Sequence, residues 1–105
     1  MNVDRLELRL DPVVFHGDRD ENNFFGWLES IPGFQGFVGR GEEMLVFFDQ
    51  SLFTPHSFLE LLRFFMRYRI DRGRLVPLLS SLPEAERSKY ADPESPWHDA
   101  LFGPL

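Results

Sequence analysis

Alternating apolar and polar positions predict three strands. Near the N-terminus, Arg5, Glu7 and Arg9 separate three leucines that form the inner face of a half-buried strand: Leu6, Leu8 and Leu10. Two further strands are predicted at 34–40 and 43–49, joined by a hairpin turn around Gly41. Glycines within 34–40 indicate a bulge or a strong twist.

The strand at 43–49 is apolar on both faces, which predicts a central position in the sheet. The apolar side chains on one side of this strand must then lie on the face of the sheet that the helices do not cover. We expect the C-terminal tail or another molecule to cover that surface.

A helical period of apolar residues predicts a first helix after the turn at His16. Asp18 is expected to cap it, with Glu21 completing the capping box, and Pro32 ends it. Its inner face is predicted to hold Phe24, Leu28 and Ile31.

The sequence between Phe53 and Gly73 predicts a longer helix, with Thr54 as N-cap, Pro55 in the first position and Gly73 as the left-handed stop. It is apolar around most of its circumference, which predicts that it is largely buried. A narrow polar stripe runs along this helix and comprises Glu60, Arg63, Arg67, Asp71 and Arg74. These side chains are expected to pair mainly within the chain, Glu60 with Arg63 and Arg67 with Asp71.

The C-terminal part is rich in proline. Whether residues 74–79 form a fourth strand is left open by the pattern, and Pro77 would confine such a strand to an edge of the sheet. Short helices are predicted at 83–90, after a capping box that starts at Ser81, and at 97–102, ending at Gly103.

The order β-α-β-β-α predicts an α+β fold of the ferredoxin-like type, with an antiparallel sheet and two helices on one face. The chain of 105 residues is predicted to be one domain, with an α+β core in 1–79 and a helical, proline-rich tail in 80–105.

Composition restricts the function. The net charge of −6 disfavours binding to nucleic acid and suits either a basic protein partner or simple solubility. The sequence lacks cysteine, shows no signal peptide and has no apolar run long enough for a membrane span, which favours the cytoplasm. None of the three histidines lies in a metal-binding pattern, and no catalytic or cofactor motif is recognised.

Three acidic groups lie in predicted turns and helix starts: Asp18, Asp20 and Glu21; Glu42 and Glu43; Asp92, Glu94 and Asp99. They are interpreted either as a partner-facing rim or as solvated caps. Trp97 is interpreted either as the residue that fixes the tail to the domain or as an anchor for a partner.

A short, acidic chain without cysteine, rich in aromatic residues and ending in the proline-punctuated segment around Trp97, resembles the small immunity proteins that bacteria encode beside polymorphic toxins of contact-dependent or type VI systems. That resemblance implies a non-catalytic cytoplasmic inhibitor without cofactor or metal, which binds one cognate toxin domain. The expected contact residues are Asp18, Asp20, Glu21, Glu42, Glu43, Trp97 and Asp99. The alternative is a ferredoxin-like dimer with a small-molecule or catalytic pocket at the sheet, and a homodimer is left open in either case.

Overall fold

Three antiparallel strands form the sheet, in the order β1-β3-β2. The computed structural model describes residues 5–10, 13 and 15–103, and for Arg40 only the main chain. The strands are β1 (Arg5–Leu10), β2 (Phe34–Arg40) and β3 (Glu43–Asp49), and β3 is central as its two apolar faces predicted.

The register places the alternate leucines of β1 beside the apolar residues of β3. Leu8 lies opposite Val46 and Leu10 lies opposite Met44, so these side chains share the inner face. The pairing of β2 with β3 shifts between Phe34 and Gly36, which is the irregularity that the glycines of this strand predicted.

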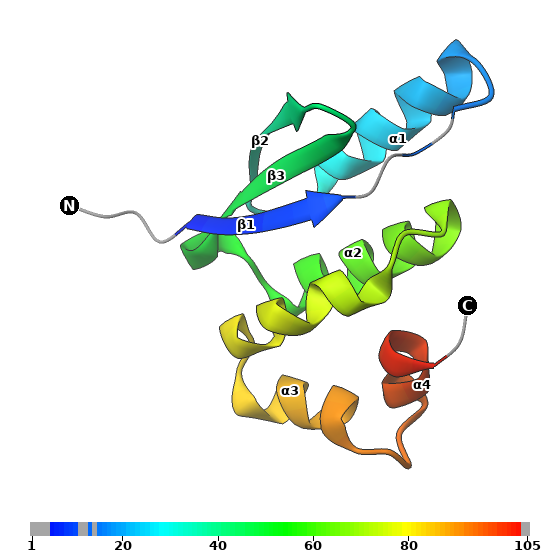
Figure 1. Ribbon diagram of the computed structural model, residues 1–105. Coiled ribbons are helices and arrows are strands. Elements are labelled where there is room, and N and C mark those ends of the chain that lie inside the picture. Colours follow the sequence, from blue (N-terminus) through cyan, green and yellow to red (C-terminus); the bar gives the residue numbers. More distant parts are fainter. Residues whose placement is uncertain (1–4, 11–12, 14, 104–105) are drawn as a thin grey trace.

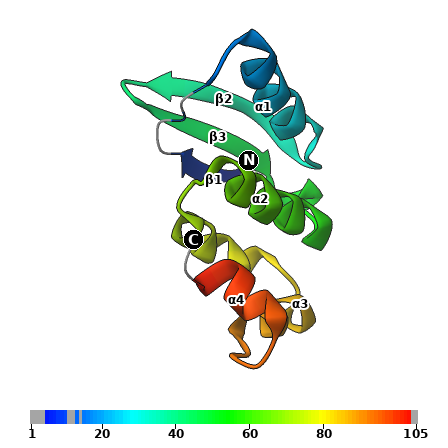
Figure 2. The ribbon, with the colours of Figure 1, turned by 90° about the vertical axis from the view of Figure 1, so that its right-hand side faces the viewer.

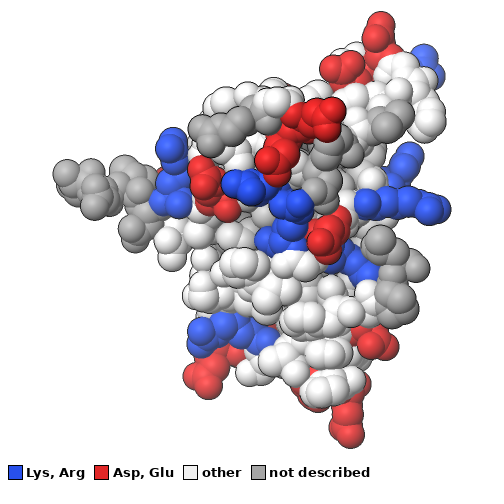
Figure 3. Space-filling model, viewed as in Figure 1, with Lys and Arg blue, Asp and Glu red and all other residues white. Residues whose placement is uncertain are grey.

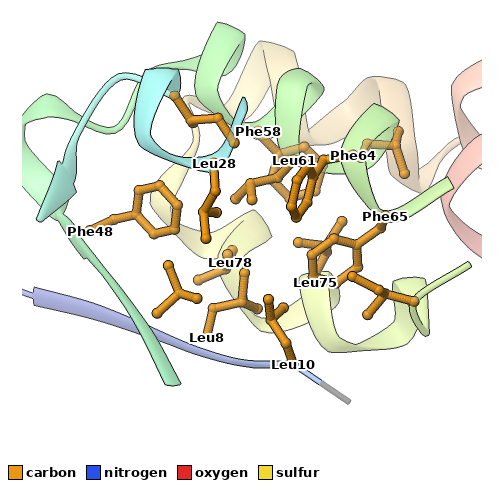
Figure 4. Packing of buried hydrophobic residues seen from close by; sticks show 14 of the residues in the cluster. Leu8, Leu10, Leu28, Phe48, Phe58, Leu61, Phe64, Phe65, Leu75 and Leu78 are labelled. Atoms are coloured by element: carbon orange, nitrogen blue, oxygen red, sulfur yellow. The ribbon is translucent and has the colours of Figure 1, made fainter. Parts of the chain in front are cut away.

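Helices α1 (Asp18–Ser30) and α2 (Pro55–Tyr68) both lie on the inner face of the sheet (Figures 1 and 2). A short 3-10 turn, η1 (Gln50–Leu52), connects β3 to α2. Side chains from β1, β3, both helices and the following segment point into one common core (Figure 4). The predicted inner face of α1 is confirmed, because its three residues are all buried: Phe24, Leu28 and Ile31.

The predicted cap of α1 is wrong. Gly17 occupies the N-cap position without a side-chain bond, and Asp18 is the first helical residue. The carboxylate of Asp20 accepts a hydrogen bond from the main-chain N–H of His16, at 3.1 Å. The acidic first turn still stabilises the helix, because carboxylates interact favourably with the positive end of the helix dipole.

The start of α2 agrees with the prediction and its end does not. Thr54 caps the helix by accepting from the N–H of Ser57 at 3.1 Å, and Pro55 is the first helical residue. The helix ends at Tyr68, and the cap residue Arg69, four residues before Gly73, adopts the left-handed conformation with φ of 57°. This reversal directs Ile70 into the core, and we attribute the early stop to that burial.

Residues 72–81 form a 3-10 helix, η2 (Arg72–Ser81), in place of a fourth strand. Its buried residues Leu75 and Leu78 extend the core beside β1. Within the described part of the chain the sheet has three strands, and the ferredoxin-like arrangement is not confirmed.

Two short helices complete the described chain, α3 (Glu84–Ala91) and α4 (Pro96–Phe102). Both lie within a residue or two of their predicted ranges. The predicted capping box at Ser81 is wrong, because Pro83 is the N-cap of α3 and no side chain caps this helix, whereas the hydroxyl of Ser95 caps α4.

Helix α2 lies between the sheet with α1 on one side and the C-terminal helices on the other (Figure 2). Tyr90 of α3 and Leu101 of α4 belong to the same buried cluster as Phe58 and Phe65 of α2. This position explains why α2 is apolar around most of its circumference. Its predicted burial is confirmed in part, because five of its apolar residues are buried, Phe58, Leu61, Leu62, Phe64 and Phe65, whereas Met66 is 48% exposed.

Candidate functional site

Acidic side chains lie over the start of α1 and, as a separate group, over the β2–β3 hairpin, and others lie elsewhere on the same face (Figure 3). Asp18, Glu21 and Glu42 are exposed, whereas Asp20 and Glu43 are half-buried. We call these five residues the acidic end. Arg19, which is also exposed, is the basic residue within this first turn of α1.

The two carboxylates of the hairpin differ in their partners. Glu43 forms an ion pair with Arg9 of β1, with 3.5 Å between Nε and Oε2. Glu42 has no ion pair with any residue that the structure describes. The charge of Glu42 is therefore open to a partner.

A hollow of about 250 Å³ lies between the hairpin and the side chains of Val13 and Phe15, and we call it the hairpin hollow. Its described lining comprises apolar side chains, two glycines and two glutamates: Leu10, Val13, Phe15, Phe24, Met44, Gly39, Gly41, Glu42 and Glu43. Leu10 and Phe24 are fully buried, so an apolar floor is combined with an acidic rim.

Aromatic contacts fix the walls of the hairpin hollow relative to one another. The ring of Phe15 packs edge-on against Phe24 of α1, with 5.1 Å between centroids. The ring of Phe25 stacks on Phe37 of β2 at 4.9 Å. Helix α1 is thus attached both to the segment before it and to the hairpin, which holds the acidic end in a defined shape.

The two remaining predicted contact residues, Trp97 and Asp99, lie on α4, on the other side of α2 from the acidic end (Figures 1 and 2). Trp97 is half-buried, and its ring packs against Tyr90 with 6.1 Å between centroids. Next to it, Nδ1 of His98 lies 2.8 Å from the main-chain oxygen of Tyr90. The structure therefore does not bring all seven predicted contact residues onto one surface.

Of the two covers expected for the outer face of the sheet, the C-terminal tail is wrong, because its helices pack on the side of α2 that faces away from the sheet, and cover by another molecule stays a prediction. The guanidinium of Arg5 lies over the ring of Phe47, at 4.3 Å from its centroid. Leu45 is buried opposite Arg9 of β1, and both residues line, together with Pro77 of η2, a hollow of about 310 Å³. Long side chains of β1 and the η2 segment thus cover much of the outer apolar surface of β3.

The polar stripe of α2 pairs in part as predicted. Arg63 and Glu60 form an ion pair at 3.3 Å. Arg67 and Asp71 do not pair: Arg67 lies over the ring of Tyr68 at 5.2 Å, and Asp71 accepts from the N–H of Gly73. The helix ends before Asp71, so the spacing of four residues no longer places the two side chains on one helical face.

The sequence interpretation missed Arg72. Its side chain is buried and donates hydrogen bonds to the main-chain oxygens of Ala100 and Gly103. Nothing in the sequence distinguishes Arg72 from its exposed neighbours, because its acceptors lie about thirty positions further along the chain.

Among the described residues, the structure holds no group of three or more His, Cys, Asp or Glu side chains that could bind a metal ion. None of the helices in that part of the chain has the length and apolar character needed to cross a membrane. Comparisons with protein-family models, with curated proteins and with solved structures found no match.

Proposed function

We propose that the protein binds a basic protein partner through the acidic end and, as the resemblance to immunity proteins implies, neutralises a toxin domain in the cytoplasm. The observation that supports this proposal is that Glu42 and Glu43 line a largely apolar hollow, while further carboxylates lie in the first turn of α1. Such a surface offers both the long-range attraction and the short-range burial that a protein interface needs.

Charge supplies the long-range part of the argument. The chain carries a net charge of −6, and three carboxylates of the acidic end are exposed without an ion pair among the described residues: Asp18, Glu21 and Glu42. Unpaired surface charges of one sign steer an oppositely charged partner and raise the association rate. A basic toxin domain is the partner that this distribution favours.

The alternative, a dimer that binds a small molecule at the sheet, has weaker support. Small-molecule sites are commonly about 300–1,000 Å³ and mostly apolar, and the hairpin hollow is smaller, at about 250 Å³. A second hollow, of about 310 Å³, lies at the sheet beside η2 and reaches that range, but three of its lining residues are charged: Glu7, Arg9 and Arg74. The size of the hairpin hollow suits one side chain of a protein partner better than a complete ligand.

The finer fold assignment belongs to the same proposal. The strand order β1-β3-β2 with α1 and α2 on one face is compatible with a split β-α-β unit of the ferredoxin-like type. In this interpretation η2 occupies the edge beside β1 at which a further strand could pair.

Growth rescue tests the proposal. The protein is co-expressed with the product of the neighbouring reading frame, and neutralisation is measured as restored growth. A triple variant, Asp18→Asn, Glu21→Gln and Glu42→Gln, is expected to lower the association rate by about tenfold or more and to weaken its dependence on salt.

A matched control changes the net charge equally but elsewhere: Glu29→Gln, Glu84→Gln and Glu94→Gln, all at exposed positions. If the control loses as much as the acidic-end variant, net charge rather than this surface governs binding. If the neighbouring product is not toxic, or no complex with it forms, the proposed function is wrong.

A further inference from the structure

We infer that the hairpin hollow receives an arginine side chain of the partner and that Glu42 is its counter-ion. This inference rests on the proposed function and names the chemical group that the acidic end recognises. The size, the lining and the charge of the hollow support this inference.

The walls of the hollow leave space for an inserted group. Gly39 and Gly41 form part of its lining, and a Cβ atom built on either would meet no heavy atom within 4 Å. The hairpin side is therefore open, while Leu10 and Phe24 close the floor. The volume of about 250 Å³ is that of a side-chain site rather than a complete ligand site.

The lining suits the stem and the plane of a guanidinium-bearing side chain. Phe15 and Met44 are half-buried and present an aromatic ring and a flexible thioether to the hollow. An aliphatic stem packs on such groups, and a planar guanidinium stacks on an aromatic ring.

One carboxylate at the rim of the hollow has no cationic partner among the described residues. Arg9 already neutralises Glu43, but Glu42 lies at the same rim without an ion pair among the described residues. A carboxylate accepts two parallel hydrogen bonds from a guanidinium, which lysine cannot offer. Arginine is therefore the favoured occupant.

The test uses the full chain labelled with ¹⁵N and three small probes: Nα-acetyl-arginine amide, the corresponding lysine amide and the neutral citrulline amide. The amide resonances of Gly39 and Gly41 report on the hollow directly. The arginine probe is expected to shift both resonances saturably in the millimolar range, the lysine probe to bind more weakly, and the citrulline probe to leave them unchanged.

Two variants test whether Glu42 is the counter-ion of the bound arginine probe. Glu42→Gln is expected to weaken the arginine probe about fivefold, the scale of an exposed ion pair. The matched control Glu94→Gln, in the exposed turn between α3 and α4, is expected to leave binding unchanged. Equal shifts with the citrulline probe, an unchanged affinity in Glu42→Gln, or no shift up to roughly 50 mM arginine probe overturns the inference.

The outcome also separates this inference from the proposed function. If neutralisation of the toxin depends on Asp18 and Glu21 but the arginine probe does not bind, the proposed function stands and the hollow is not an arginine site. If the probe binds as expected but the chain neutralises no toxin, the hollow is an arginine site and the proposed function is wrong.

Discussion

The guanidinium group of Arg72 lies at the end of α4 and donates a hydrogen bond to the main-chain oxygen of Ala100. Carbonyl groups in the last turn of a helix have no intrahelical partner and carry negative partial charge, so a buried cation there completes the helix end. A second bond, to the oxygen of Gly103, strengthens the attachment of α4 to η2.

Replacing Arg72 by Met is expected to lower the free energy of unfolding by about 2–4 kcal/mol, because two charge-assisted hydrogen bonds are lost and carbonyl groups remain unpaired. Chemical denaturation followed by circular dichroism measures the change. Arg87→Met on the exposed side of α3 is the control and should stay within about 0.5 kcal/mol of the parent. Equal effects of the two variants would show that the buried bonds add no stability.

Ser57 is the other buried polar side chain among the described residues, and it joins α2 to the turn before β2. Its hydroxyl donates to the main-chain oxygen of Pro32 at 2.8 Å and accepts from the N–H of Thr54 at 3.0 Å. Ser57→Ala is expected to cost about 1–3 kcal/mol in urea denaturation. Ser80→Ala removes a bond between an exposed hydroxyl and the oxygen of Pro77, so it should cost clearly less.

Interactions local in sequence could be predicted, whereas those that depend on distant contacts could not. The ranges of β2 and β3 and the cap at Thr54 follow from alternation and capping rules that span a few residues. The end of α2 at Tyr68 could not be predicted from Gly73, because we attribute it to the burial of Ile70, which depends on distant contacts.

The candidate site shows the same division. The acidic residues at the start of α1 and in the hairpin were identifiable, because acids in turns are visible in the sequence. The hairpin hollow was not, since its lining comes from segments more than thirty positions apart, such as Leu10 and Met44. Trp97 is a candidate contact from its residue type and its proline-flanked segment, but it belongs to α4, which lies on the other side of α2 from the hairpin.

Gly26 in α1 provides a test of helix propensity without tertiary contacts. The position is exposed, and a Cβ built there would meet no heavy atom within 4 Å. Gly26→Ala is expected to raise the free energy of unfolding by about 0.5–1 kcal/mol. At Gly33 the same change should destabilise, because φ is +93° and a Cβ would lie 3.2 Å from the main chain of Leu52. A loss of stability in Gly26→Ala would reveal a contact that the structure does not contain.

Burial of the Tyr90 ring raises the pKa of its phenol above the ordinary value of 10.0, and Glu86 raises it further, against a smaller opposing effect of Arg63. The folded state therefore retains this proton more tightly than the unfolded state. The resulting stability is fully present below pH 10 and is lost as the pH rises through the folded-state pKa.

Tyr90→Phe removes the titrating group while keeping the ring. Between about pH 8 and pH 11, the parent should lose more stability than Tyr90→Phe, and the titration of lysine and arginine cancels in the comparison. Urea denaturation at both pH values measures the difference. Parallel losses in the two proteins would mean that Tyr90 titrates alike in the folded and unfolded states.

Trp97 allows the two interpretations of the C-terminal helices to be separated. Its half-buried ring packs against Tyr90, and Tyr90 in turn packs on Phe58 of α2 with 4.9 Å between centroids. Trp97→Ala is therefore expected to lower the free energy of unfolding by about 2 kcal/mol, as for a partly buried aromatic side chain. Phe102→Ala, at a position that is 47% exposed, should cost less.

The same variant must also be compared in the growth-rescue experiment, under conditions in which it is folded. If Trp97 fixes the tail to the domain, folded Trp97→Ala still neutralises the toxin, because the acidic end lies on the other side of α2. If its stability is unchanged but neutralisation is lost, Trp97 contacts the partner. The binding surface would then have to include α4, and the acidic end alone could not account for recognition.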